Sequence, residues 1–337
     1  MTIREQIEKM EHETLSEFAT QSSDSRGRDV DEPQCDIRPL FQRDRDRILH
    51  CKAFRRLKNK TQVFLSPMGD HYRTRLSHTL EVSQNARTIA KALRMNEDLT
   101  EAIALGHDLG HTPFGHAGEA VLNNLNPDGF IHAEQSVRLV EKLEKDGEGL
   151  NLTWEVRDGM RNHRSDGVPA TPEGKIVQLS DKIAYINSDI DDAIRANILS
   201  EDSIPLEIRK TLGFTSRERL DTLIHDVIIA SMDSPEIRNS TEIGQAKDEL
   251  RAFMFKNVYK NHIAKAEEEK AKILVEKLYE YYLEHIDLIP NKFLNLVGQT
   301  KEDTKERIVC DYISGMTDQY AIAKYSEFFM PKAWSEE

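Results

Sequence analysis

The sequence has few cysteines and no long apolar run. Only three of its 337 residues are cysteine, and Cys35, Cys51 and Cys310 lack the CxxC spacing of a cysteine-based metal site. An odd, widely spaced set is typical of a protein kept reduced, so we expect a cytoplasmic location. The polar start MTIREQIEKM has no apolar signal core. No stretch approaches the roughly 18 apolar residues of a membrane span, so we expect no membrane partner.

The chain also has no excess of basic over acidic residues. The chain has 59 acidic and 46 basic residues, and its formal net charge is −13. Such a charge argues against a protein that coats nucleic acid with its whole surface. The basic residues are unevenly distributed, because residues 43–75 contain ten of them and only three acidic ones. This basic segment (residues 43–75) suggests an anionic ligand held at one place, and a solvated helix face is the alternative.

Hydrophobic periodicity indicates that the chain is mainly helical. Over residues 76–93 apolar side chains recur on one helix face, and His78 lies one turn before the first of them, Val82. Asn96 is a typical N-cap for the next helix, whose apolar stripe places His107 on its buried side. Two helices are therefore predicted to deliver one histidine each to a common interior.

A long helix is predicted to start at Thr171-Pro172 and to run to about residue 199. Asp181, Tyr185 and Asp189 lie four residues apart, on one side of it. Further helices are expected at about residues 39–60, 119–125, 133–143, 154–163, 217–232, 242–262 and 265–289. Residues 61–65 are the one candidate for a short strand. We expect an all-α fold with a C-terminal helical extension and at most a small β-hairpin.

The segment Gly106–Glu119, GHDLGHTPFGHAGE, concentrates polar side chains that a hydrophobic core does not need. His107 and Asp108 supply an imidazole nitrogen and a carboxylate side by side. With His78 and Asp181 they form a set of two imidazoles and two carboxylates that suits a divalent metal ion such as Mn, Mg, Fe, Ni or Zn. Such an ion lowers the pKa of bound water and polarises a phosphoryl oxygen. Taken alone, His78 would be a core histidine and Asp181 a charge on a helix face.

Three further histidines are candidates for catalysis. His116 and Glu119 are three residues apart, and a carboxylate beside an imidazole suits proton transfer near neutral pH. A surface pair with no catalytic role is the alternative. His132 is either an assisting residue or a structural one, and His111 either contacts the metal ligands or phosphate or is an ordinary turn histidine.

These residues resemble the H…HD…D signature of the HD-domain phosphohydrolase superfamily. The segments FQRDRDRI (41–48), FRRLKNKTQV (54–63), YRTRLSHTLEV (72–82) and GHDLGHTPFGHAGE (106–119) are similar to those of bacterial deoxyguanosine triphosphate triphosphohydrolases. The resemblance is dense over residues 38–195, where several motifs occur in order. The C-terminal third is similar only in being helical, with a family-like RAFMFKNVY stretch at 251–259.

The resemblance implies hydrolysis of a deoxynucleoside triphosphate (dNTP) to deoxynucleoside and tripolyphosphate, which controls dNTP levels. It implies one divalent metal ion per subunit, held by His78, His107, Asp108 and Asp181. His116, supported by Glu119 and assisted by His132, would act as general acid or base. The substrate-binding positions would be Arg56, Gln62, Arg75, His111, Lys182, Tyr185, Asp189, Arg251 and Tyr259.

The resemblance also implies a domain organisation and partners. We expect a polar N-terminal segment at 1–37, an HD core at 38–200, and an extension at 201–337 that completes the pocket and the oligomer contacts. A hexamer or tetramer, a second dNTP as activator and weak single-stranded DNA binding are implied in the same way. The alternatives are an HD-type nucleoside 5′-monophosphatase or phosphodiesterase, and an oligomer that senses nucleotides or binds single-stranded nucleic acid.

Overall fold

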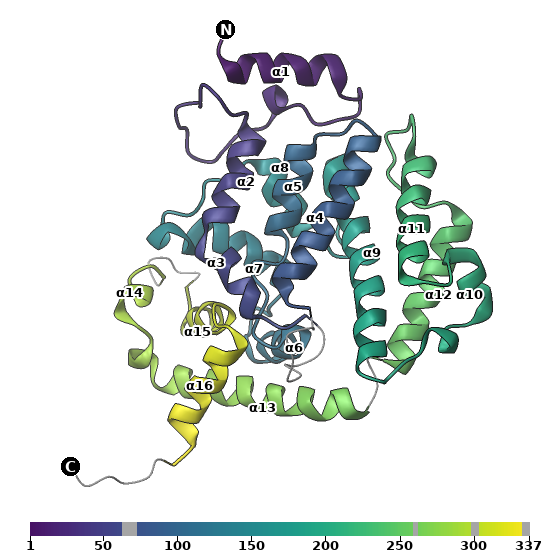
Figure 1. Ribbon diagram of the computed structural model, residues 1–337. Helices are drawn as coiled ribbons and strands as arrows, with labels where there is room; N and C mark the ends of the chain where they lie inside the picture. The colour runs from purple at the N-terminus through teal and green to yellow at the C-terminus, as the bar shows by residue number, and fades with distance from the viewer. Residues whose placement is uncertain (63–72, 259–261, 298–302, 332–337) are drawn as a thin grey trace.

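Three helices, α4 (Arg75–Ala92), α5 (Glu97–Gly106) and α9 (Pro172–Arg195), pack against one another at the centre of the computed structural model (Figure 1). The structure describes residues 1–62, 73–258, 262–297 and 303–331. Within these ranges it contains helices and one isolated β-bridge, so the all-α prediction is confirmed. No described helix is both long and apolar enough to cross a bilayer.

The local sequence explains where the central helices begin. Thr74 and Ser77 form a capping box at the start of α4. The side chain of Asn96 accepts a hydrogen bond from the backbone N–H of Leu99 in α5, and Thr171 caps α9 ahead of Pro172. The predicted stripes are buried, with Val82, Ala86, Ile89, Leu99 and Ile103 each 0% exposed. All three predicted helix starts are therefore confirmed.

The remaining helices surround this centre. Helices α2 (Leu40–His50) and α8 (Trp154–Arg161) pack on α5, and α7 (His132–Arg138), followed by a π-helical turn at Leu139–Leu143, packs on α8. Helices α11 (Ser216–Ser231) and α12 (Thr241–Asn257) lie beside α9, and α10 (Leu206–Leu212) packs on α11 and α12. Helix α13 (His262–Glu284) packs on α6 (Gly115–Leu125), and α15 (Lys305–Ser314) and α16 (Asp318–Phe329) pack on α13. The short α14 (Asn291–Leu294) completes the C-terminal group.

One prediction about the first 60 residues is corrected. Residues 39–60 form α2, α3 (Lys52–Arg56) and a 3₁₀ turn rather than one helix. The break lies at Cys51, which is extended, and the carboxylate of Glu144 accepts hydrogen bonds from the backbone N–H groups of Lys52 and Ala53. A distant side chain thus supplies the new helix start, which local periodicity cannot reveal.

The polar N-terminal segment is partly helical. It forms α1 (Ile3–Thr14), which begins with a capping box at Thr2. The carboxylate of buried Glu11 accepts hydrogen bonds from the backbone and hydroxyl of Ser22. The carboxylate of Glu173 in α9 likewise accepts two from Thr20. Buried carboxylates attach this segment together with Phe18 and Ala19, which pack against the core.

The predicted hairpin is only partly visible. Thr61 and Thr74 form the isolated antiparallel bridge, and residues 63–72 between them lie outside the described part of the chain.

Candidate active site

The four predicted metal ligands lie together in the interior. Helix α4 carries His78, the end of α5 leads into His107 and Asp108, and α9 carries Asp181. The Oδ1 atom of Asp181 lies 3.0 Å from Nε2 of His78 and 3.9 Å from Nε2 of His107. The Nε2 atom of His107 lies 3.7 Å from Oδ1 of Asp108. Three helices separated in sequence thus direct two nitrogens and two oxygens at one place.

The donor atoms fit a divalent metal ion. The Nδ1 atom of His107 donates to the carbonyl of Ala104 at 2.6 Å, which leaves a lone pair on Nε2. That Nε2 is buried and has no hydrogen-bond partner among the described residues. A buried ring nitrogen without a partner is costly, and a bound cation would satisfy it. The backbone hydrogen bond also fixes the ring in the orientation typical of a ligating histidine.

Both carboxylates of this set are held in the charged form. Burial alone would raise the pKa of Asp108, but His107 and Arg75 lower it well below its usual range. The guanidinium of Arg75 donates to Oδ2 of Asp108 at 2.6 Å, and both side chains are buried. Burial likewise opposes ionisation of Asp181, yet its hydrogen bond with His78 lowers the pKa to about 2. Two carboxylates charged at neutral pH suit a cation.

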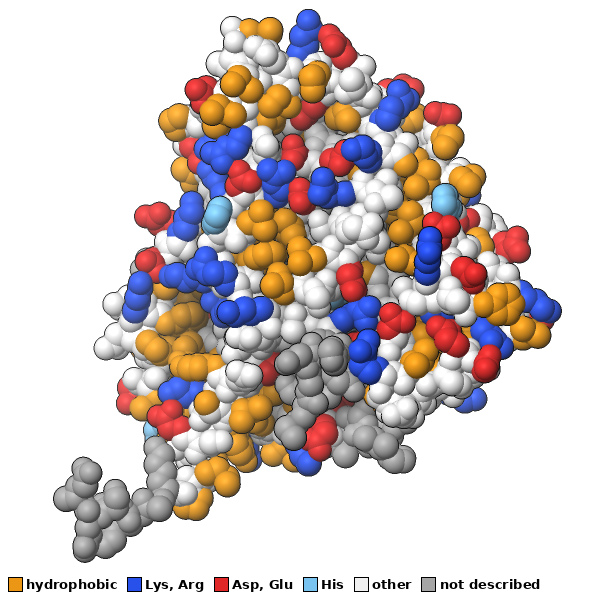
Figure 2. Space-filling model, in the orientation of Figure 1, with side chains coloured by type: hydrophobic (Ala, Val, Ile, Leu, Met, Phe, Trp, Pro, Cys, Tyr) orange, Lys and Arg blue, Asp and Glu red, His pale blue; other side chains and the backbone are white. Residues whose placement is uncertain are grey.

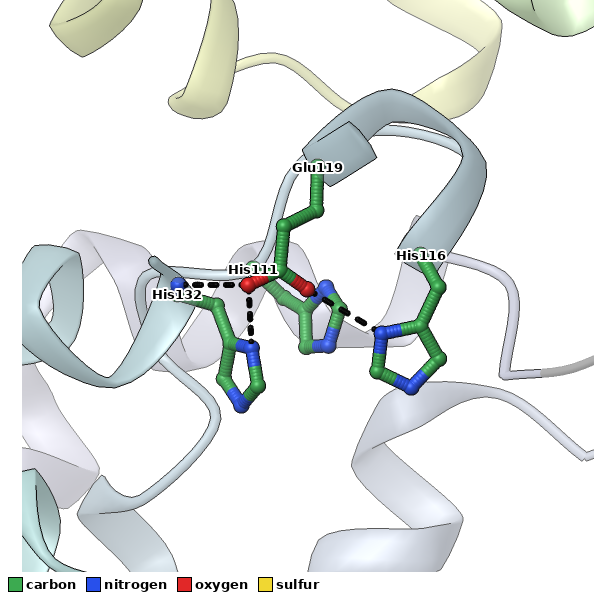
Figure 3. A group of neighbouring side chains, drawn as sticks. All are labelled: His111, His116, Glu119 and His132. Carbon is green, nitrogen blue, oxygen red and sulfur yellow. Dashed lines mark hydrogen bonds and ion pairs between the residues drawn. The ribbon is translucent and has the colours of Figure 1, made fainter. Parts of the chain in front are cut away.

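A second group of side chains surrounds Glu119 of α6 (Figure 3). Its Oε2 accepts a hydrogen bond from Nδ1 of His116 at 3.1 Å, and its Oε1 accepts one from Nδ1 of His132 at 2.9 Å. Burial alone would raise the pKa of Glu119, but these two hydrogen bonds lower it well below its usual range. An ionised Glu119 can only accept, so it fixes the proton of both histidines on Nδ1. The side chain of His116 is 79% exposed, whereas His132 is buried.

The backbone that presents His116 is tightly bent. Phe114 precedes α6 in the left-handed region with φ of 61°, and its N–H donates to Oδ1 of Asp318 in α16 at 2.9 Å. A Cβ atom at Gly118 would lie 2.2 Å from the carbonyl oxygen of Pro113, so only glycine fits there. Gly118 thus allows α6 to pass close to the backbone of Pro113.

Two more histidines join the group. The ring of His111 stacks on that of His132 with centroids 4.2 Å apart, and burial, Arg75 and His132 hold its pKa well below the usual range. His163 was missed by sequence reasoning, which treated it only as the end of a helix. Its Nε2 lies 3.1 Å from Nε2 of His132. Burial, followed by His107 and His132, lowers the pKa of His163 to about 4. No sequence signal marked it, because only the fold brings it to these partners.

Some of the predicted substrate-binding residues lie near one another on α9 and α12. Lys182, Tyr185 and Asp189 follow Asp181 along α9, and burial raises the pKa of Tyr185 to about 12. Arg251 of α12 is near enough to affect the pKa values of Tyr185 and Lys182. Arg56 and Gln62 are half-buried, and Tyr259 lies outside the described residues.

The basic segment does not form one anion site. Ion pairs with carboxylates involve six of its ten basic side chains: Arg43, Arg45, Arg47, Lys52, Arg73 and Arg75. Lysine and arginine side chains lie beside aspartates and glutamates over much of the face in Figure 2. Lys60 is fully buried, and its Nζ donates to the carbonyls of His111 and Ser314. Most basic residues of this segment are therefore paired with carboxylates of the protein itself.

A different cluster of cations lies beside the metal ligands. Burial, followed by the charges of Lys247, Lys175 and Arg251, lowers the pKa of Lys182. Burial also lowers the pKa of Lys247, and Lys175 and Arg251 contribute. Helices α9 and α12 thus bring these cations near one another, with Lys182 next to Asp181 in sequence and with Asp248 and Asp226 also acting on Lys247. An anion would relieve the repulsion among the cations.

Comparison with known proteins agrees with this geometry. Residues 75–186 match the HD domain family, and residues 237–327 match the phosphohydrolase-associated domain. A deoxyguanosinetriphosphate triphosphohydrolase-like protein of Caldanaerobacter subterraneus subsp. tengcongensis is 58% identical over 100% of this chain and 98% of its own. A protein of the same name from Clostridium perfringens is 49% identical over 98% of this chain and 99% of its own. A crystal structure of a hypothetical protein from Aquifex aeolicus is 19% identical, with a TM-score of 0.47 over 86% of this chain and 68% of that chain.

Proposed function

The chain belongs to the HD-domain family of deoxyguanosinetriphosphate triphosphohydrolase-like proteins, and from this membership we propose that it hydrolyses deoxynucleoside triphosphates to deoxynucleoside and tripolyphosphate. The family supports a phosphohydrolase, and the choice of substrate and products is the proposal. The main support is the proximity of two sets of side chains within one short segment, Gly106–Glu119. His107 and Asp108 belong to the metal-ligand set, and His116 and Glu119 to the proton-transfer set.

The metal-ligand set would consist of His78, His107, Asp108 and Asp181. A divalent ion bound there, with Mn, Mg, Fe, Ni and Zn as candidates, would lower the pKa of water and neutralise charge on a phosphoryl oxygen. Arg75 holds Oδ2 of Asp108. The two carboxylates, both ionised at neutral pH, would keep the site ready for a cation.

His116 is the candidate general acid. Water attacks the α-phosphorus, the bond from phosphorus to the 5′-oxygen breaks, and His116 gives its Nε2 proton to that oxygen. Glu119 orients the ring through Nδ1 and stabilises its charged form. His132 would assist through its own hydrogen bond to Glu119. The exposure of His116 suits it to meet a substrate arriving from solvent.

The cations of α9 and α12 are the candidate triphosphate site. Within the described part of the chain neither Lys182 nor Arg251 forms an ion pair with a carboxylate, and arginine suits phosphate geometrically. Tyr185 is placed one turn after Asp181, where its ring would lie against the sugar and exclude a 2′-hydroxyl. A homo-oligomer, an activating second dNTP, weak single-stranded DNA binding and a cytoplasmic location belong to the same proposal, by family likeness.

Product analysis tests the proposal. Purified protein is incubated with Mn²⁺ and each dNTP in turn and then with all four, and the products are separated by ion exchange. We expect tripolyphosphate and free deoxynucleoside, with activity lost in Asp181→Ala and kept in Asp202→Ala, whose side chain is 91% exposed. Release of orthophosphate or pyrophosphate would contradict the assignment and favour a monophosphatase or phosphodiesterase. No turnover under any of these conditions would favour a binding role.

A further inference from the structure

Helix α1 faces the body of the protein with charged side chains and faces solvent with apolar ones. Arg4 and Glu8 pair with each other and are largely buried, and Glu11 is buried as well. Ile3 and Met10, by contrast, are 53% and 58% exposed. Helices at a protein surface usually have the opposite arrangement. An apolar helix side turned to solvent is typical of a surface that another molecule covers.

The exposed apolar residues of α1 form one stripe. Ile3, Ile7 and Met10 occur at i, i+4 and i+7, which is the spacing by which a helix binds in an apolar groove. None of the three belongs to the two hydrophobic clusters that the described residues form. Figure 1 shows α1 at one end of the molecule, beyond the ends of the core helices. The stripe is therefore available to another molecule.

A groove of the corresponding kind lies between α4 and α11, with a volume of about 460 Å³. Leu220, Ile224 and Ile228 of α11 line one side at i, i+4 and i+8, and Gln84 and Thr88 of α4 line the other. The three apolar side chains pack against the core but are only partly buried. Figure 2 shows hydrophobic side chains along α11 beside an uncharged strip over α4. The chain thus carries both an exposed apolar helix side and an apolar groove of similar spacing.

The charges of the two surfaces are complementary. Within α1, four glutamates outnumber two basic residues. On the α4 side of the groove, Arg87 and Lys91 lie one turn after Gln84 and Thr88, and both are exposed. An acidic helix is attracted to a groove with such a basic edge, and the attraction also favours one orientation over others.

We propose that α1 of one copy of this protein docks in the α4–α11 groove of a second copy. Within its own chain α1 is held away from this groove, because Thr20 and Ser25 bind the carboxylates of Glu173 and Glu155 and attach the segment after α1 to α9 and α8. A head-to-tail contact of this type is either exchanged between two copies or closes a ring of more. The inference specifies one contact of the homo-oligomer in the proposed function and in that respect rests on it.

Sedimentation velocity of the purified full-length protein tests the contact, with and without the four dNTPs. We expect the wild type to sediment as an oligomer. Met10→Glu and Thr88→Glu each put a charge into the apolar contact, so both should sediment as single chains. Ile229→Glu is the matched control, because Ile229 of α11 is 70% exposed and does not line the groove, and it should stay assembled. Circular dichroism checks that each variant is folded.

Disulfide formation identifies what occupies the groove. Ile7→Cys and Thr88→Cys are each made with Cys35→Ser, since the other two cysteines are buried. The two proteins are oxidised separately and after mixing with time for exchange of subunits. We expect covalent dimers only in the mixture. Covalent dimers of Ile7→Cys alone would show that α1 pairs with α1 of the second copy, which would overturn the proposal.

The remaining outcomes separate this proposal from the proposed hydrolysis. A wild type that sediments as a single chain under both conditions would overturn the contact and remove the homo-oligomer from the proposed function. An assembled Met10→Glu would overturn the contact alone, and so would an Ile229→Glu that dissociates, because the interface would then lie outside the groove. Hydrolysis is measured independently by release of tripolyphosphate, and none of these results decides it.

Discussion

Glu119 is the residue on which the protonation of two histidines depends. It is largely buried, its pKa is lowered by the hydrogen bonds from His116 and His132, and it accepts a third bond from the backbone of His132. A carboxylate in this position holds each ring in one tautomer. Asp108 has the corresponding place among the metal ligands, where Arg75 fixes one of its oxygens. Glu119 thus orients the two histidines of the proton-transfer set, and Asp108, held by Arg75, belongs to the proposed metal-ligand set.

Replacing Glu119 by glutamine tests its role as a positioning residue. The amide keeps the shape but loses the charge, and its NH₂ cannot accept from Nδ1. We expect kcat to fall by roughly 10²–10⁴, with KM for the dNTP changed much less, as measured by steady-state tripolyphosphate release.

Glu134→Gln is the matched control for this change, because Glu134 pairs with Arg161 at the surface and should leave kcat unchanged. A loss of less than about threefold in Glu119→Gln would show that His116 does not need the carboxylate.

Helix α16 forms a hydrogen bond with the residue that precedes α6, although the two are more than 200 residues apart in sequence. Its first residue, Asp318, is 3% exposed. One of its oxygens accepts from the N–H of Phe114, and the other accepts from the N–H and hydroxyl of Thr61. Phe114 needs such a partner, because its left-handed backbone is unfavourable for a residue with a side chain. The C-terminal group thus holds in place the turn that presents His116.

Asp318→Asn should weaken this attachment. An asparagine has one acceptor oxygen where Asp318 has two, so a buried N–H loses its partner at a cost of about 1–3 kcal/mol. We expect the free energy of urea-induced unfolding to fall by that amount. We also expect kcat to fall roughly 10- to 100-fold, since His116 shifts from its working position.

The number of bound Mn²⁺ ions should stay unchanged in Asp318→Asn, because no metal ligand touches Asp318. The exposed Asp202→Asn is the control. Loss of metal together with activity would mean that the whole loop had collapsed, and that outcome would contradict a role confined to α6.

Helices with a single apolar face were predictable, and their breaks were not. The stripe over Val82, Ala86 and Ile89 indicated α4, because the apolar residues of a buried helix face recur at helical spacing in the local sequence. The break at Cys51 depends on Glu144, which lies more than 90 residues later. The proposed metal ligands could be named because they match a known pattern. His163 matches no such pattern, and Asp318 acts on residues more than 200 positions earlier in the sequence. The domain boundaries at 37 and 200 stay a prediction.

At the scale of the whole molecule, Lys60 joins the early and late parts of the chain. Its Nζ donates to the carbonyl of His111 at 2.5 Å and to that of Ser314 at 2.7 Å. Burial, followed by the charge of Arg56, lowers its pKa well below the usual range. Most other cations of the basic segment pair with carboxylates, so Lys60 is unusual in meeting only carbonyl oxygens directly.

The stability of the protein should therefore depend on pH through Lys60. Because the folded pKa is lowered, the unfolded chain binds more protons at any pH between the folded pKa and the ordinary lysine value. The unfolding free energy from this group then rises with pH, by up to about 1.4 kcal/mol per pH unit. The stabilising contribution of Lys60 is fully present above the ordinary lysine pKa. It is lost as the pH falls through the pKa that Lys60 has in the folded state.

Urea unfolding of wild type and Lys60→Met at several pH values between about 7 and about 10 measures this slope by difference, so that other groups cancel. We expect the wild type to gain stability relative to the variant as pH rises. Lys58→Met, two residues away and exposed, should show no such trend. A constant difference across the range would show that Lys60 titrates normally in the folded state.

The contacts made by Ser314 and Asp318 also bear on synthesis of the protein. A ribosome completes the segment from His78 to Asp181 well before it reaches α15 and α16. Every proposed ligand of the metal site is then present in the nascent chain. Ser314, the second acceptor for Lys60, and Asp318, the acceptor for Thr61 and Phe114, are not. A premature stop codon between residues 200 and 310 would consequently yield a product that contains the whole HD signature and is inactive. The proposed hydrolase activity would begin only after the last helices had been translated and docked.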